Sequence, residues 1–166
     1  YSTCQGEAFP VEVVNLNAGD ILEYDWSHVD PSKIDLTDPS NPIFTLEETT
    51  TFTSTISNQF GCSIEREVTI DIGELPQIDS VTADDYTIIL GESTNLNVLG
   101  GNNSYVYTWD EDPSLSSTTS TNPTVTPEQT TVYTIEIESE DGCIITRTVT
   151  VEVLDLPCEE PYIFIP

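Results

Sequence analysis

An internal repeat is the feature of this sequence that most restricts how the chain can fold. Residues 41–72 align with residues 122–153 without a gap, at a constant offset of 81 positions, and 14 of the 32 aligned pairs are identical. The identical pairs include the dipeptides at 61–62 and 142–143, both Gly-Cys. Self-similarity of this extent predicts two units of the same architecture.

The boundary between the repeats is predicted at Gly-Glu-Leu-Pro, residues 73–76. Pro76 has no backbone N–H and cannot continue a hydrogen-bonded strand ladder. Nothing before Tyr1 corresponds to residues 78–89, so we expect the first repeat to be clipped at its start. The expected segments are residues 1–73 for the first repeat, 74–157 for the second, and 158–166 for the start of a linker.

Alternation of apolar and polar residues predicts β-strands, and no segment has the sustained apolar spacing of a helix. Residues 133–138 read Tyr-Thr-Ile-Glu-Ile-Glu, and residues 145–153 alternate in the same way. One face of each strand should therefore pack in a core while the other contacts water. Gly142 lies in an acidic turn that should join these strands as a hairpin. We expect an all-β protein of two tandem β-sandwich domains.

Aromatic residues at matching positions of the two repeats are predicted to be structural. Trp26 and Trp109 each follow a Tyr-x pair on a central strand, and their rings should lie in the core. Phe52 and Tyr133 begin the penultimate strand of each repeat and resemble the corner residue of immunoglobulin-like sandwiches. Several short strands within roughly 80 residues are typical of that architecture.

The charge of the chain restricts its partners. There are 30 Asp and Glu residues against three Lys and Arg, and the formal net charge is −27. A field of this sign excludes nucleic acid and anionic membrane surfaces as partners. No apolar run approaches the roughly 20 residues of a membrane helix, so we expect no membrane insertion. His28 has no Ser or Cys nucleophile in a recognisable motif, and we expect no enzymatic activity.

Four cysteines without a C-x-x-C pair predict disulfide bonds rather than a zinc or redox site. Disulfides form and persist in oxidising compartments, so we expect an exported protein.

The repeats also share a series of short motifs. In the first repeat these are Cys4-Gln5-Gly6, Tyr24-Asp25-Trp26, Asn41-Pro42, Phe52 and Gly61-Cys62. In the second they are Tyr107-Thr108-Trp109, the segment 122–127 (Asn-Pro-Thr-Val-Thr-Pro), Tyr133-Thr134 and Gly142-Cys143. The series resembles the PKD-like or immunoglobulin-like repeats of surface and secreted proteins from gliding Bacteroidetes. The closing residues 161–166 look like the entry to a type B sorting domain of the type IX secretion system.

The resemblance implies a protein at the cell surface, on the exterior of the outer membrane, that type IX machinery exports through a downstream domain. We therefore expect a non-enzymatic stalk or display module of an adhesin, whose partners are the neighbouring domains of the same polypeptide and, in an adhesive role, surface polysaccharide. The alternative is a carbohydrate-binding or accessory module of a secreted multidomain hydrolase. Exposed rows of aromatic residues on one sheet would favour that alternative, whereas Thr and Glu on the outer faces favour the stalk.

The cysteine pairing remains open between two arrangements. Bonds Cys4–Cys62 and Cys143–Cys158 would each stay inside one repeat, with Cys158 replacing the cysteine that the second repeat lacks at Ile89. A straight strand over residues 144–153 would, however, place Cys158 far from Cys143. The competing arrangement joins Cys4 to Cys143.

Two groups of charged residues have alternative interpretations. Asp110, Glu111 and Asp112 could supply oxygen ligands to Ca²⁺, but no D-x-D-x-D-G loop is present, and we favour a solvated acidic surface with no cofactor. In the alternating pattern of their strands, Arg66 and Arg147 occupy positions on the same face as the apolar residues. We expect each to lie over the rim of the core, with its guanidinium paired to a carboxylate or stacked on an aromatic ring.

Overall fold

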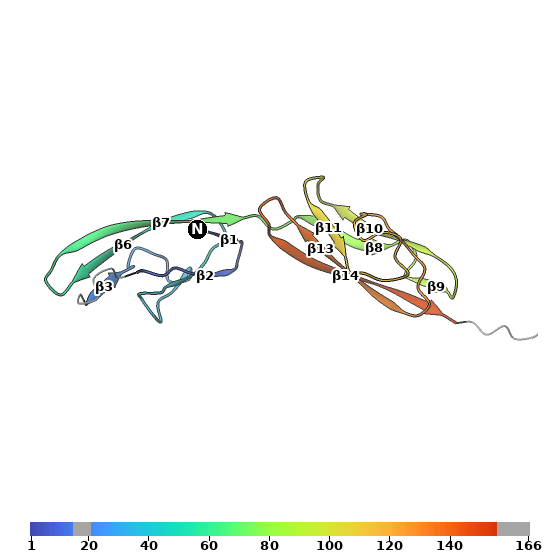
Figure 1. Cartoon of the computed structure of the whole chain (residues 1–166), viewed down its shortest axis with the longest axis horizontal. Helices are drawn as coiled ribbons and strands as arrows, with labels where there is room; N and C mark the ends of the chain where they lie inside the picture. Colours follow the sequence, from blue (N-terminus) through green and yellow to red (C-terminus); the bar gives the residue numbers. More distant parts are fainter. Residues whose placement is uncertain (15–20, 156–166) are drawn as a thin grey trace, which may run out of the picture. The chain divides into compact units, whose positions relative to one another are not determined.

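The structure, a computed structural model, describes residues 1–14 and 21–155. It divides the chain into two compact units, unit 1 (Tyr1–Glu74) and unit 2 (Leu75–Pro166), shown in Figure 1. The division falls one residue after the boundary expected from the sequence. The described residues form strands and loops, which confirms the predicted all-β fold, and they contain no helix suited to span a membrane. The predicted linker at 158–166 lies outside the described residues.

Unit 2 is a sandwich of two sheets with strand orders β12-β10-β8 and β11-β13-β14-β9 (Figure 1). Its strands are β8 (Ile78–Ala83), β9 (Thr87–Ile89), β10 (Thr94–Gly100), β11 (Val106–Trp109), β12 (Thr124–Val125), β13 (Thr131–Glu138) and β14 (Ile144–Leu154). Strand β9 runs parallel to β14, and the other pairs are antiparallel. Apolar side chains from both sheets form a single core, which is what makes the two sheets a sandwich.

Unit 1 repeats the four-stranded sheet as β1-β7-β6-β3, and its second sheet is β2-β5-β4. Its strands are β1 (Ser2–Cys4), β2 (Ala8–Pro10), β3 (Leu22–Asp25), β4 (Ile34–Asp35), β5 (Ile43–Thr45), β6 (Thr50–Asn58) and β7 (Ser63–Gly73). The parallel pair β1–β7 has the register of β9–β14, because Ser2 lies opposite Asp71 as Thr87 lies opposite Glu152. The internal repeat of the sequence is therefore a repeat of strand pairing.

The alternation predicted for the long hairpins is confirmed in β13. Tyr133 is 3% exposed and Ile135 and Ile137 are fully buried, whereas Glu136 and Glu138 are exposed. The turn after this strand contains Gly142 at φ 80°, and the matching turn of unit 1 contains Gly61 at the same angle. A positive φ is costly for residues with a Cβ, so glycine is the suitable residue at this point of both hairpins.

The two tryptophans hold equivalent places in the two cores, as the sequence predicted. Trp26 is 4% exposed and Trp109 1% exposed. The indole N–H of Trp26 donates to the carbonyl oxygen of Pro39 at 3.0 Å, and that of Trp109 donates to the carbonyl oxygen of Ser120 at 2.9 Å. Each ring thus buries its apolar surface and satisfies its one polar atom on a loop carbonyl.

The predicted bond between Cys4 and Cys62 is wrong. Cys4 and Cys143 are each disulfide-bonded, whereas Cys62 is an exposed free thiol. The reason is the direction of β1, which places Cys4 opposite Gly73 at the end of β7, while Cys62 lies just before its start. Eleven strand residues at ~3.3 Å each span ~36 Å, and a disulfide needs Cα atoms within ~7 Å. Cys158 lies outside the described residues.

The predicted partners of the two arginines are also wrong. Arg66 and Arg147 are exposed, and each guanidinium donates to the carbonyl oxygen of the preceding residue, Glu65 at 3.0 Å and Thr146 at 2.9 Å. Within the described part of the chain, neither guanidinium pairs with a carboxylate or an aromatic ring. β9 pairs with β14 only at 152–154, so the outer edge of β14 is open beside Arg147 and its long side chain reaches water.

Arg147→Ala should therefore change the free energy of unfolding by no more than about 0.5 kcal/mol, because no buried group loses a partner. The buried neighbour on the same face, Val149, is the matched control, since Val149→Ala opens a space in the core and should cost more. Urea unfolding of both variants compares them. A larger loss in the arginine variant would mean that its stem contributes to the core.

Candidate functional site

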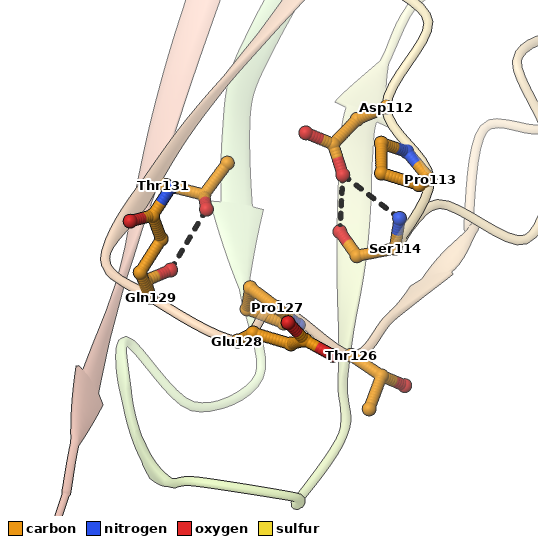
Figure 2. A pocket seen from close by; sticks show the side chains of 8 residues that line it. All are labelled: Asp112, Pro113, Ser114, Thr126, Pro127, Glu128, Gln129 and Thr131. Carbon is orange, nitrogen blue, oxygen red and sulfur yellow. Dashed lines mark hydrogen bonds between the residues drawn. The ribbon is translucent and has the colours of Figure 1, made fainter.

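Unit 2 contains a polar hollow of about 590 Å³ between two loops (Figure 2). One loop, residues 112–114, follows β11; the other, residues 126–131, joins β12 to β13. The backbone N–H of Thr126 donates to the carbonyl oxygen of Ser114 at 3.1 Å and fixes one loop against the other. The lining is formed by Asp112, Pro113, Ser114, Thr126, Pro127, Glu128, Gln129 and Thr131.

A chain of hydrogen bonds ties Asp112 to the core. One carboxylate oxygen of Asp112 accepts the backbone N–H of Ser114 at 2.9 Å and also its hydroxyl group, as Figure 2 shows. The Ser114 hydroxyl in turn lies 2.6 Å from the phenol oxygen of Tyr133. Burial raises the pKa of Tyr133, the hydrogen bond to Ser114 opposes that rise, and the nearby charge of Asp112 adds to it. The phenol therefore stays protonated and holds Ser114, which lines the hollow, through their hydrogen bond.

Sequence reasoning identified Tyr133 and Asp112 but not Ser114, which joins them. In unit 1 the same turn is made by Asp30, Pro31 and Ser32, where one oxygen of Asp30 accepts both the N–H and the hydroxyl of Ser32, each at 2.9 Å. Phe52 stands there in place of the tyrosine and is buried at 8% exposure. The phenol is thus absent at this position of unit 1, and the hydrogen bond between serine and tyrosine belongs to unit 2.

The lining groups of the hollow are carboxylates, hydroxyls and an amide. They can hydrogen-bond a hydroxyl-rich ligand. The backbone carbonyl oxygen of Gln129 accepts a hydrogen bond from the Thr131 hydroxyl at 2.8 Å, which holds this end of the loop.

The structure does not assemble the predicted calcium ligands. Asp110 and Glu111 are exposed and do not line the hollow, whereas Asp112 is half-buried and bonded to Ser114. Among residues 1–14 and 21–155, no three His, Cys, Asp or Glu side chains are grouped as a metal site. The solvated acidic surface remains the prediction for these residues, and calcium its alternative.

A second set of acidic residues organises the long loops of unit 1. Asp25, Asp30, Asp35 and Asp38 each accept the backbone N–H of the residue two positions later, at 2.8 to 3.0 Å. Each of these later residues is Ser or Thr. The hydrogen bonds lower the pKa of all four carboxyl groups; for Asp35 the Thr37 hydroxyl is the largest cause and the Thr37 N–H the next. The signal was present in the sequence as D-x-S or D-x-T, the pattern that Asp112 and Ser114 also share.

These turns should make stability depend on pH below about 4. The folded pKa of Asp35 lies below its ordinary value of 3.8, so the charged carboxylate stabilises the fold above that pH, and the contribution is lost as pH falls through the folded pKa. Asp35→Asn keeps an acceptor but removes the charge. Its melting temperature should lie below that of the native chain at pH 7 and approach it as the pH falls below about 3.8. A gap that stays constant down to pH 2.5 would contradict the assignment.

No protein-family model matches the chain. It is 30% identical over 155 residues to an uncharacterized protein from Ruminiclostridium cellulolyticum, an alignment that covers 87% of this chain and 42% of the relative. The chain thus spans about two fifths of the length of that relative.

Among solved structures, the chain is similar to the N-terminal eight Ig domains of Down Syndrome Cell Adhesion Molecule, with a TM-score of 0.58 and 15% identity. The similarity covers 92% of this chain and 23% of that one. The chain is a pair of tandem immunoglobulin-like domains. Extracellular domains 3–5 of Drosophila OTK give a TM-score of 0.46 at 13% identity, over 93% of this chain and 59% of that one. The immunoglobulin-like fold rests on the first of these structures, together with the two-sheet architecture of each unit.

Proposed function

We propose that the tandem immunoglobulin-like domains are a non-enzymatic spacer that displays neighbouring parts of an extracellular polypeptide. The observation that carries the proposal is the outer face of the long hairpins, which is polar in both units except for Val132 and Ile144 in unit 2. In unit 1, Thr51 lies opposite Thr69 and Thr53 opposite Glu67. In unit 2, Glu136 lies opposite Thr146.

Such faces are hydrated and suited to contact with solvent rather than with a partner. The large exposed aromatic residues of the described chain, Tyr1, Phe60 and Tyr86, do not form a row on these sheets, because Phe60 lies in the turn between β6 and β7 and Tyr86 in the connection between β8 and β9. A flat aromatic platform for sugar rings needs such a row. The polar faces therefore support the spacer over the alternative of a carbohydrate-binding module.

A domain exchange tests the spacer role. In the organism that encodes the chain, residues 1–154 are replaced by two unrelated β-sandwich domains of the same total length. A spacer tolerates the exchange, so the amount of the parent polypeptide that external protease reaches on whole cells should stay the same. Loss of that exposure, or of adhesion to a surface, with the exchanged protein still present at normal amounts would show that these domains themselves recognise something.

The hollow beside Asp112 is where a carbohydrate-binding role would reside. Affinity electrophoresis of the purified chain in gels containing surface polysaccharides should show unchanged migration. Glu128→Gln and Gln129→Ala are the matched variants for this measurement, since both residues are exposed on the rim. Retardation of the native chain that either variant removes would favour the accessory module of a secreted hydrolase.

Export from the cytoplasm is the remaining part of the proposal. It is supported by the disulfide bonding of Cys143 and Cys4, since disulfides persist in oxidising compartments. The more specific route, through the type IX machinery to the exterior of an outer membrane, is supported by the motif resemblance alone. Cell fractionation of a strain with that secretion system disabled tests the route: the protein should then be retained in the periplasm.

A further inference from the structure

One edge of β14 in unit 2 is open over most of its length. Strand β13 pairs with one side of β14 from Ile144 to Val151. Strand β9 pairs with the other side at residues 152–154 alone (Figure 1). Within the part of the chain that the structure describes, residues 144–151 thus have no strand partner on this second side, which we call the open edge.

The open edge presents backbone groups that a further strand could bind. The N–H of Glu152 donates to the Tyr86 carbonyl oxygen at 2.8 Å, so the backbone groups of Glu152 point to the side of β9. Because this direction alternates along a strand, the N–H and C=O groups of Thr148 and Thr146 point to the same side. A row of such groups on a sheet edge is a template for pairing with another chain.

The sequence of the open edge favours such pairing. Residues 144–150 read Ile-Ile-Thr-Arg-Thr-Val-Thr, and six of these seven are β-branched, the type of residue that is enriched in strands. The chain has 30 acidic residues, yet residues 142–151 contain none, so the repulsion that separates other surfaces of two copies is missing here. Short segments of high β-propensity and low charge, without Pro, are prone to pair with other chains.

Arg147 is the single charged residue in this segment and stands at its centre. Its guanidinium donates to the Thr146 carbonyl oxygen at 2.9 Å, which is one of the acceptors that an added strand would need. At the matching position of β7, Arg66 makes the same contact with the Glu65 carbonyl oxygen at 3.0 Å. The chain has only three Lys and Arg residues, and two of them hold this position in the two repeats.

Pairing of two copies through the open edge would bring their arginines together. A two-fold axis perpendicular to the sheet relates two identical strands that pair antiparallel, so residues of the same sheet face lie opposite each other. A register centred on Arg147 places the two arginines directly opposite, and one centred on Thr146 or Thr148 places them on a diagonal. Their Cβ atoms are then about 5–8 Å apart, a spacing at which like charges destabilise the pair.

An added strand would also close the route by which Arg147 reaches water. The residue starts from the same face as Val149, which is 4% exposed, and Arg147 is itself exposed because its side chain extends past the open edge. With that edge covered, the guanidinium would lie over the core, where no carboxylate of the described residues pairs with it. Removing an unpaired cation from water is strongly unfavourable, and inward-facing charges on edge strands oppose pairing for this reason.

We propose that Arg147 prevents the open edge of β14 from pairing with the same edge of a second copy of the chain. It acts through its positive charge, which meets a like charge in the pairing, and through the Thr146 carbonyl oxygen, which its guanidinium already occupies. This role goes beyond that of a spacer, because it concerns how neighbouring copies of the chain stay separate. It also explains why an exposed arginine that pairs with no carboxylate stands in the middle of an apolar alternation.

The test replaces the charge with a neutral β-branched residue, in Arg147→Thr. A Cys62→Ser background excludes dimers through that exposed thiol. Sedimentation velocity at about 100 µM chain should show a monomer with Arg147 present and a dimer or larger species with the substitution. Salt at about 0.15 M screens charges more than ~8 Å apart, so the overall negative charge does not by itself keep the copies separate. Hydrogen exchange of the Thr146 and Thr148 amides should slow by roughly tenfold or more in the associated variant.

Two controls separate the charge from other effects of the substitution. Arg147→Lys keeps the positive charge and should stay monomeric. Arg66→Thr is the matched change on β7, where Glu65 and Glu67 of two copies would still lie opposite each other and repel, so this variant should also stay monomeric. A monomeric Arg147→Thr, association without slower exchange at Thr148, or equal association of either control would overturn the proposal.

A second experiment decides the question where Arg147→Thr cannot be recovered in soluble form. Arg147→Glu reverses the charge, so two copies of this variant repel each other as two native copies do. In a mixture with the native chain, the glutamate of one copy meets Arg147 of the other, and the two attract. A complex in the mixture that neither protein forms alone supports the proposal, whereas a mixture that stays monomeric contradicts it.

Discussion

Replacement of Trp109 by alanine should destabilise unit 2 by about 3–5 kcal/mol, the largest effect expected from any single substitution in the chain. The ring is 1% exposed and lies in the core that β8, β10, β13 and β14 enclose, so its removal leaves a cavity that the surrounding sheets cannot close. The carbonyl oxygen of Ser120 also loses its indole donor. Urea unfolding followed by circular dichroism measures the loss.

Two controls separate the contributions to this effect. Trp109→Phe keeps most of the ring volume and should cost less than the alanine variant. In Trp109→Ala, Trp26 is the remaining tryptophan, and its fluorescence transition should be unchanged because it reports on unit 1. Trp26→Ala should cost less than Trp109→Ala, since Trp26 lines a surface hollow of about 360 Å³ between residues 11–14 and strands β6 and β7, and is therefore less completely enclosed. Equal losses for the two alanine variants would contradict the difference between the cores.

Strand alternation predicted the buried faces well where a strand lies between two others. In β13, which pairs with β11 and β14, every second residue is buried. The same reasoning failed for Arg147 on β14, because that strand has a partner on its outer side only at residues 152–154. The alternation of residues along a strand identifies the face of the sheet from which a side chain projects. The alternation does not show whether the strand has an open edge, past which a long side chain can extend into solvent.

The polar part of the candidate site was only partly predictable. Asp112 was selected for its charge, but its role follows from Ser114 two residues later and from Tyr133, 19 residues after that serine. The D-x-S spacing is visible in the sequence, whereas the contact with Tyr133 requires the loop after β11 to fold back on β13. The turn could thus be predicted from a short sequence pattern, whereas the contact between Ser114 and Tyr133 could be found only from the three-dimensional structure.

The motif Gly-Cys could not show where its cysteine lies relative to Cys4. That depends on β1, a strand of three residues that runs parallel to the end of β7. Such a short strand has no readable alternation, and parallel pairing brings together residues that are distant in sequence. The sequence therefore indicated disulfide bonding correctly but assigned the wrong partner to Cys4.

Removal of the disulfide at Cys143 should have the second largest effect. Cys143→Ser should lower the free energy of unfolding by about 2–5 kcal/mol, the usual cost of losing a native disulfide in a small extracellular domain. The position is 1% exposed, so the serine hydroxyl also enters an apolar site. Thermal unfolding under non-reducing conditions measures the change, and a reducing agent should lower the stability of the native chain towards that of the variant.

The matched control is Cys62→Ser, at the same position of the other repeat. Cys62 is exposed and free, so this variant should unfold within about 0.5 kcal/mol of the native chain. Cys62 should also react with a thiol reagent in the folded, non-reduced protein, because its sulfur is accessible to solvent, whereas Cys143 should not react until the disulfide is reduced. Protection of Cys62 from the reagent, or equal destabilisation by the two serine variants, would show that Cys62 is bonded and that the pairing inside the first repeat exists after all.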